Sequence, residues 1–273
     1  MVEIKYVWHD CFIVVTDTCS MVFDYWCEAP REDSADGPDC RADMPGAIAV
    51  LDRSRPLYVF VSHSHKDHYN PAIFAWAQTF DKIRYIVSND VYRRMRHVIS
   101  ATSVYNGPKV EASKVTAMRA GDVFDDGCVR VRAFPSTDIG NSYAVSAAGR
   151  DFFHAGDLNA WIWKDESAEE EIRKAVGDFE ACLHSMHDSG IRRFDYAFFP
   201  VDSRIGTDYF TGASMFVREF DVARFFPMHF ALGDAHERSV RLRDALRFSL
   251  YLNPERGEYI PLAYPGFTFV DCS

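Results

Sequence analysis

The sequence lacks three features that would each indicate a particular class of protein. No apolar run approaches the roughly 18 residues of a membrane-spanning helix, so no such helix is predicted. The seven cysteines include no Cys-x-x-Cys pair, which is typical of reduced thiols and not of a disulfide framework. Positive charge is scarce, since 30 Lys and Arg stand against 40 Asp and Glu and the formal net charge is −10. General nucleic-acid binding needs a cationic surface, so this balance counts against it.

What remains is the composition of an ordinary globular protein. The chain has 273 residues, of which 48% are hydrophobic and 26% are charged. Residues 1–5 carry charges before any apolar segment forms, so no signal peptide is predicted and we expect a cytoplasmic protein. Neither a repeat nor a linker interrupts the chain, which favours a single domain over 1–273. Residues 29–46 are rich in Pro, Asp and Gly and are interpreted as a loop insertion or lid.

Hydrophobic patterning and turn signals predict strands interspersed with helices. Strands are expected at 2–7, 12–15, 21–25, 57–62, 83–88, 129–134, 142–146, 151–154, 196–200 and 224–228. Helices are expected at 71–80, where Asn70 caps and Pro71 begins the helix, from 89 onward, and at 165–188, 211–220 and 236–248. This alternation predicts an α/β domain with a mixed sheet.

The apolar strand at 57–62 leads directly into a cluster of histidines. His63, His65, Asp67 and His68 lie within six residues. Neutral imidazoles and carboxylates are the usual ligands of catalytic zinc and of neighbouring transition metals. His63 and His65 share one face of an extended backbone, whereas Asp67 and His68 belong to the turn that follows. A metal site is favoured over a solvated loop, because packing does not require imidazoles that must be desolvated or paired.

These residues and three later segments resemble the motifs of one family. The run from His63 to His68 resembles the HxHxDH signature of the metallo-β-lactamase superfamily of metal-dependent hydrolases. Gly156-Asp157 at the end of a strand resembles the motif whose aspartate bridges two metals, and His229 resembles the last metal-binding histidine. Asp24 resembles the aspartate that supports the histidine loop. The resemblance runs from about residue 4 to about residue 230, and it is nearest to the ascorbate-6-phosphate lactonase-like branch.

The resemblance implies both a fold and a ligand set. The fold is a four-layer αββα sandwich with one or two divalent ions at one edge; zinc is the first expectation, and manganese or iron are alternatives. A first ion would be held by His63, His65 and a further histidine, and a second by Asp67, His68 and His229. Asp157 would lie between the two ions. Asp67 and Asp157 are the implied catalytic residues, since they would orient the nucleophile and bridge the metals.

The third motif of the family departs from its pattern here. No histidine occurs between His97 and His154, and the matching stretch, 134–140, offers Ser136 and Asp138. Asp138 would supply a hard oxygen ligand and shift the preference toward ions such as manganese. Ser136 would bind weakly or not at all. The second ligand set is complete, whereas the first depends on this substitution.

Further polar residues follow predicted strands and allow two interpretations each. His9 lines the pocket or is a hydrogen-bonded histidine at the sheet edge. His154 supports a metal ligand from behind or packs in the core. Asp202 follows a strand end, where α/β proteins place functional loops. Arg204 could bind a substrate carboxylate or phosphate, although a surface arginine is the simpler interpretation.

Together these features predict metal-assisted hydrolysis of a small molecule. A bound divalent ion lowers the pKa of its water to about 7, and the resulting hydroxide would attack a small ester, a lactone or a related carbonyl compound. One alternative is a phosphodiesterase or nuclease with the same metal site. Another is a degenerate member that binds a metal or ligand without catalysis, because the first ligand set is altered. Trp161 and Trp163 would form a pocket wall or pack against the core.

Overall fold

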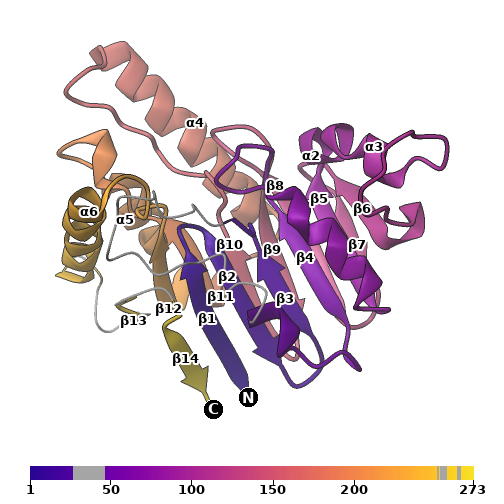
Figure 1. Ribbon diagram of the computed structural model, residues 1–273. Coiled ribbons are helices and arrows are strands. Elements are labelled where there is room, and N and C mark those ends of the chain that lie inside the picture. Colours follow the sequence, from indigo (N-terminus) through magenta and orange to yellow (C-terminus); the bar gives the residue numbers. More distant parts are fainter. Residues whose placement is uncertain (27–46, 251, 253–256, 263–265) are drawn as a thin grey trace.

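The computed structural model describes residues 1–26, 47–250, 252, 257–262 and 266–273 (Figure 1). Two seven-stranded mixed sheets pack face to face, with helices outside them. This arrangement confirms the αββα sandwich that the sequence predicted. The predicted loop or lid at 29–46 lies outside the described residues, and the division of the chain into one domain stays a prediction.

The first sheet combines an antiparallel half with a parallel half. From β14 to β3 neighbouring strands are antiparallel, and from β3 to β6 they are parallel. Its strands, in spatial order, are β14 (Thr268–Asp271), β1 (Val2–Trp8), β2 (Cys11–Thr16), β3 (Ser20–Phe23), β4 (Leu57–Val61), β5 (Ile83–Ser88) and β6 (Val115–Met118).

The second sheet repeats this plan. From β7 to β10 the neighbours are antiparallel, and from β10 to β13 they are parallel. Its strands, in spatial order, are β13 (Glu258–Tyr259), β12 (Asp221–Met228), β11 (Arg193–Pro200), β10 (Arg150–His154), β9 (Asn141–Ala147), β8 (Val129–Pro135) and β7 (Val123–Asp125).

Helices cover the outer faces of the two sheets (Figure 1). On the first sheet lie η1 (Pro71–Gln78), α2 (Asn89–Arg94), α3 (Arg96–Ile99) and η2 (Ala112–Lys114). On the second lie α4 (Glu169–Asp188), α5 (Thr211–Glu219) and α6 (Ala235–Arg247), which η4 (Phe248–Leu250) follows; η3 (Ser203–Ile205) lies instead at the carboxyl end of β11. In the described parts of the chain, no helix combines the length and the apolar character that crossing a membrane requires.

Most predicted elements are present, and the differences have local causes. The segment predicted as a helix at 71–80 is a 3₁₀ helix, and the Asn70 side chain caps it by accepting from the Ala72 N–H. Helix α4 begins at Glu169 instead of 165, because the backbone N–H groups of Glu166 and Ser167 bond to the Trp163 carbonyl and form a separate turn. Strands β6, β7, β13 and β14 were not predicted.

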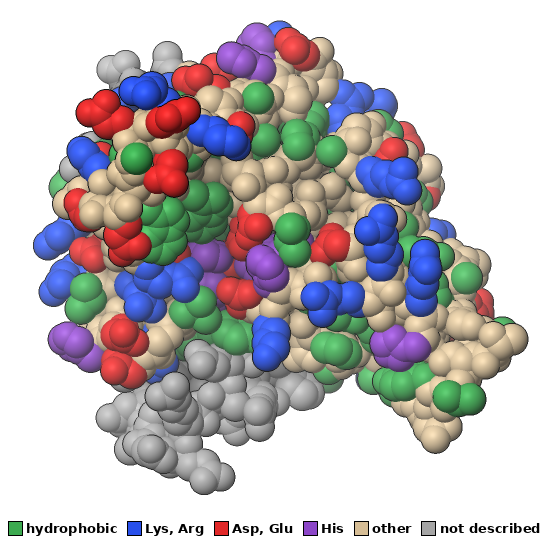
Figure 2. Space-filling view, turned by 90° about the horizontal axis from the view of Figure 1, so that it is seen from above, with side chains coloured by type: hydrophobic (Ala, Val, Ile, Leu, Met, Phe, Trp, Pro, Cys, Tyr) green, Lys and Arg blue, Asp and Glu red, His purple; other side chains and the backbone are tan. Residues whose placement is uncertain are grey.

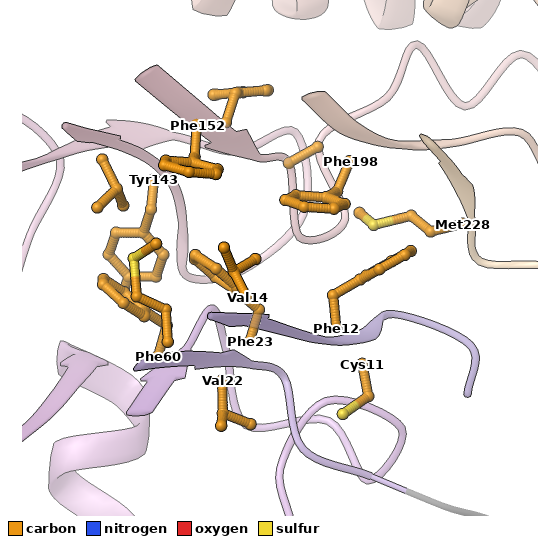
Figure 3. Packing of buried hydrophobic residues seen from close by; sticks show 14 of the residues in the cluster. Cys11, Phe12, Val14, Val22, Phe23, Phe60, Tyr143, Phe152, Phe198 and Met228 are labelled. Atoms are coloured by element: carbon orange, nitrogen blue, oxygen red, sulfur yellow. The ribbon is translucent and has the colours of Figure 1, made fainter. Parts of the chain in front are cut away.

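Aromatic side chains pack between the two sheets and join them (Figure 3). The Phe12 ring lies 4.4 Å from Phe198, and the Phe60 ring lies 5.7 Å from Tyr143, so each pair joins one sheet to the other. All four side chains are buried. Because apolar burial of this kind dominates folding, the sheet edges and the loops on them are fixed relative to each other.

The strand directions bring seven chain segments to the same edge. The parallel strands β3 and β4, and β10, β11 and β12, end at their carboxyl ends on one side of their sheets. Strand β1 runs in the same direction as β3, since both are antiparallel to β2, and β8 likewise runs with β10. The carboxyl edge of parallel strands is where α/β proteins place their ligand sites.

Candidate metal centre

At this edge, two groups of side chains bring their potential ligand atoms within 4.8 Å of one another. One group consists of His63, His65, Asp138 and Asp157. It is called the exposed group here because His65 and Asp138 are exposed, although His63 and Asp157 are buried. The buried group consists of His9, Asp10, His68 and His229. Asp157 faces both. Its Oδ2 lies 3.2 Å from His63 Nε2, while its Oδ1 lies 2.9 Å from His68 Nε2 and 3.2 Å from His229 Nε2.

The loop that carries His63 is fixed by carboxylates beneath it. Asp24 accepts from the Ser62 N–H at 2.7 Å and from the Ser62 hydroxyl at 2.6 Å. Since that hydroxyl donates to Asp24, its oxygen accepts from His63 Nδ1–H at 2.9 Å. Asp90 holds the same loop by accepting from the Ser64 N–H at 2.8 Å. His63 Nε2 therefore faces Asp157 Oδ2 at 3.2 Å and His65 Nδ1 at 3.0 Å.

His68 and His229 are oriented in the same way. His68 Nδ1 lies 2.8 Å from Asp24 Oδ2, and His229 Nδ1 lies 2.9 Å from Asp202 Oδ2 and 3.1 Å from the guanidinium of Arg204. A carboxylate behind the imidazole fixes the ring and its tautomer, and this pattern accompanies metal-ligating histidines. Both rings thus turn Nε2 toward Asp157.

His9 has the opposite tautomer. Its Nδ1 accepts from the Ala231 N–H at 3.1 Å, so the ring proton lies on Nε2. Burial lowers the pKa of His9 to about 3, which keeps the imidazole neutral. The Nε2–H faces Asp10 Oδ2 at 3.1 Å and Asp67 Oδ2 at 3.6 Å. His9 is therefore suited to donate to these carboxylates and not to bind a metal through Nε2.

His154 also lies behind the site. Its Nδ1 accepts from the Gly156 N–H at 3.2 Å, and its Nε2–H donates to the Asp10 carbonyl at 2.9 Å. The ring stacks on Phe23 with 5.1 Å between centroids. His154 thus supports the backbone of the β1–β2 turn from within the core.

Buried atoms without hydrogen bonds converge between these residues. They include Nε2 of His68 and of His229, Oδ1 of Asp157 and both carboxylate oxygens of Asp10. Burial raises the pKa of Asp10. Although burial lowers the pKa values of His68 and His229, the carboxylates of Asp157 and Asp10 raise them overall. The carboxylates thus favour positive charge at this place. A divalent cation would supply that charge, and imidazole nitrogens and carboxylate oxygens are suitable ligands for it.

The backbone at this edge is held in rare conformations. Among the described residues, five non-glycine residues have a positive φ, and four of them belong to this edge: His9 (53°), Asp24 (43°), Trp161 (45°) and His229 (68°). Such conformations cost about 1–3 kcal/mol each and are concentrated at functional sites. Gly140 has φ 81°, and a Cβ there would lie 2.1 Å from the Ser62 carbonyl oxygen. Glycine therefore permits the third-motif loop to approach the histidine loop.

The structure brings together His63, His65, His68, Asp138, Asp157 and His229 of the residues predicted from sequence. Asp138 Oδ2 lies 3.6 Å from His65 Nδ1, whereas the Ser136 hydroxyl accepts from the Asp138 N–H at 3.2 Å. Asp138, not Ser136, therefore faces the histidines. Asp67 belongs to neither group. Sequence reasoning passed over Asp10, although the end of β1 was a signal that its turn lies at this edge.

A cleft of about 400 Å³ opens beside the two groups. Its described lining is Thr137, Asp138, Asp157, Trp161, Trp163, Asp202, Arg204 and His229. Figure 2 shows histidine and acidic side chains in a hollow on this face, with hydrophobic and basic side chains at its border. Arg204 is 29% exposed, and its Nε lies 2.9 Å and 2.8 Å from the two Asp202 oxygens. Arg204 is thus part of the cleft and not a free surface arginine.

Known structures share this fold. Igni18, a metallo hydrolase from Ignicoccus hospitalis, is 14% identical, with a TM-score of 0.56 and 99% of each chain covered. A possible metal-dependent hydrolase from Veillonella parvula is 12% identical, with a TM-score of 0.58, covering 98% of this chain and 99% of that chain. CmlA, a diiron β-hydroxylase from Streptomyces venezuelae, is 13% identical, with a TM-score of 0.57, covering 98% of this chain and 54% of CmlA. These likenesses establish the fold alone.

Sequence comparisons define the family. A search of curated proteins gives no match. The model of the β-lactamase superfamily domain matches residues 37–230, which is more than half of the chain. Together with the two packed sheets and the histidine-rich edge, this match shows that the chain belongs to the metallo-β-lactamase superfamily.

Proposed function

We propose that the protein is a metal-dependent hydrolase that acts on a small ester, a lactone or a related carbonyl compound. The observation that carries the proposal is the position of Asp157, whose Oδ2 faces His63 and whose Oδ1 faces His68 and His229. A carboxylate in this position suits the bridge of a two-metal site. Divalent ions bound there would supply Lewis acidity and an activated water.

The proposed ligands of the first ion are His63, His65, Asp138 and Asp157. Asp138 takes the role of the family's third-motif histidine. The proposed second ion lies among His68, His229 and Asp157. Asp24 holds the ring of His68, and Asp202 holds the ring of His229. Carboxylates in the ligand set favour manganese or iron beside zinc, since oxygen donors suit these ions.

The chain's own residues would position the substrate and manage charge at the reacting centre. Asp67 is 24% exposed, and although burial raises its pKa, neighbouring His9 and other histidines lower it overall, so it stays ionised. It is available to ligate an ion or to orient a water. The Arg204 guanidinium, held by Asp202, is suited to bind a substrate carboxylate or phosphate at the cleft wall.

The cleft supports a small substrate. Its volume of about 400 Å³ lies in the lower part of the range of about 300–1,000 Å³ for small-molecule sites. Trp161 and Trp163 add apolar surface to the lining that contains Arg204, so an anionic compound with an apolar part fits this lining. Arg204 also suits a phosphodiester, and a small-molecule phosphodiesterase is therefore the second candidate.

The test combines metal content with turnover. Protein purified without chelators or a histidine tag is analysed by elemental mass spectrometry, and then assayed with lactones, aryl esters and bis(p-nitrophenyl) phosphate. We expect two metal equivalents and hydrolysis of carbonyl substrates. Turnover of the phosphodiester alone would favour the second candidate. Bound metal without turnover on any substrate would favour a degenerate binding protein, and absence of metal binding would refute the proposal.

A further inference from the structure

The buried group contains an aspartate that the family's motifs do not explain. Asp10 lies in the turn between β1 and β2, and its side chain is completely buried. Neither Oδ1 nor Oδ2 of Asp10 has a hydrogen-bond partner among the described residues. A buried carboxyl group in this state is stable only when a proton or a cation compensates its charge. The turn would thus be unfavourable without a positive charge beside it.

The atoms nearest to Asp10 make no hydrogen bond with it. His9 Nε2 lies 3.1 Å and His68 Nε2 lies 3.5 Å from Asp10 Oδ2, yet neither carboxylate oxygen of Asp10 has a hydrogen-bond partner among the described residues. In the same part of the chain, Nε2 of His68 and Nε2 of His229 also have no partner. The potential ligand atoms of Asp10, His68 and His229 lie within 4.8 Å of one another, so a metal ion between them would contact all three side chains.

We propose that Asp10 is a ligand of the buried metal ion, together with His68, His229 and Asp157. The inference rests on the proposed metal-dependent function. His9 then acts as a positioning residue, because its Nε2–H faces Asp10 Oδ2 at 3.1 Å while the Ala231 N–H fixes its tautomer. Hydrogen bonds to a ligating carboxylate orient it and tune the metal.

The backbone of the turn that carries Asp10 is fixed by its conformation and by hydrogen bonds. The His9 backbone has φ 53°, a conformation that L-residues rarely adopt. The Asp10 carbonyl accepts from His154 Nε2–H at 2.9 Å, and the His9 carbonyl accepts from the His229 N–H at 3.4 Å. These bonds tie the turn, which belongs to the first sheet, to two strand ends of the second sheet, so Asp10 is preorganised before an ion binds.

The assignment gives the two metal positions matching ligand sets. Each has two imidazoles and one aspartate of its own, with Asp157 shared between them. The second ion would thus be held by carboxylate oxygens as well as imidazole nitrogens, a donor set that suits manganese or iron better than an all-histidine site does. Asp67, 24% exposed and 3.6 Å from His9 Nε2, stays available to ligate this ion or to orient a water.

The test uses Mn²⁺ as the probe on the full chain. Wild type and Asp10→Asn are compared by equilibrium dialysis and by electron paramagnetic resonance. Asp271→Asn is the matched control, since Asp271 is also buried but accepts from the Tyr196 hydroxyl at 2.6 Å, far from the cluster in the sheet. We expect wild type and the control to bind two ions with a spin-coupled spectrum. Asp10→Asn should weaken the second ion by about 100-fold or more and leave the spectrum of an isolated ion.

Thermal unfolding supplies a readout that a merely structural role would not reproduce. With Mn²⁺, Asp10→Asn should unfold at a lower temperature than wild type, because it loses stabilisation by the bound ion. Without metal, the variant should be at least as stable as wild type, because the unpaired carboxylate is gone. Loss of stability in both conditions, or two Mn²⁺ with wild-type affinity in Asp10→Asn, would overturn the role of Asp10 alone. Failure of wild type to bind Mn²⁺ would overturn the proposed function with it.

Discussion

The two groups of the candidate metal centre share Asp157 but differ in how firmly they are built. In the exposed group, His65 is 47% exposed and Asp138 is 37% exposed. In the buried group, His68 and Asp10 are completely buried, and His229 is nearly so. Asp24 and Asp202 hold the two histidine rings of the buried group from behind. From this contrast we expect the ion proposed for the buried group to be retained, and the ion proposed for the exposed group to exchange with solvent.

Loss of Asp157 should break both groups and have the largest effect. Asp157→Asn removes the charge that faces both sets of histidines, so we expect both ions to be lost or bound weakly. Each proposed ion would contribute several kcal/mol to catalysis, so we expect hydrolysis to fall by roughly 10⁴-fold or more. Elemental analysis and kcat/KM measure the two effects. Retention of two ions with full activity would contradict the bridging position of Asp157.

A pair of histidine variants tests the difference between the groups directly. His65→Ala should release the ion of the exposed group and keep one equivalent in the buried group, because His68 and His229 are untouched. His68→Ala should lose the more tightly held ion. Hydrolysis should fall by roughly 10²-fold in His65→Ala and 10³-fold in His68→Ala. Timed dialysis against a chelator, with metal counted at each point, measures retention; equal loss of metal in the two variants would show that burial does not decide it.

The same contrast explains what could be predicted from the sequence. His63, His65 and His68 are neighbours in the chain, Asp157 and His229 stand in recognisable strand-end motifs, and Asp138 lies in the stretch that matches the third motif. These six residues were therefore available before the structure. Asp10 was not, because nothing local distinguishes a buried, unpartnered aspartate from one at an exposed turn. Its role depends on β12 and β4 reaching the same edge, a contact between distant segments.

The fold shows the same division between local and distant information. The strands of the interior were predicted because each buries a continuous apolar run, as in β4. Strand β14 was missed because it has only four residues and its place depends on pairing with β1 across almost the whole chain. The start of α4 was placed four residues early, because acidic residues of the preceding turn look like a helix start.

Asp202 supports the buried group from behind, and its removal should have an intermediate effect. Asp202→Asn weakens the bond that holds Nδ1–H of His229 and the pair with Arg204. Substitution of such supporting residues costs about 10–100-fold in metal affinity. We expect that loss for one ion only, measured by competition with a chromophoric chelator. Asp195→Asn, near the start of β11 and away from its carboxyl end, is the control. Equal weakening of both ions would argue against a role confined to the buried group.

Substitution of Arg204 should have the smallest effect, because it changes substrate binding and not the binding of metal. Its guanidinium is held by Asp202 on the side of the buried group and lies in the wall of the cleft. Hydrogen bonds to charged groups contribute about 1.5–3 kcal/mol, so Arg204→Met should raise KM for a carboxylate-bearing lactone by about 10-fold to 100-fold. The neutral analogue should be hydrolysed with nearly unchanged kcat/KM, because it makes no use of the guanidinium. Arg173→Met on α4, where the side chain is 71% exposed, is the control. A parallel loss on both substrates would mean that Arg204 acts through Asp202 and His229, as part of the metal support, and not as the anchor of an anionic substrate.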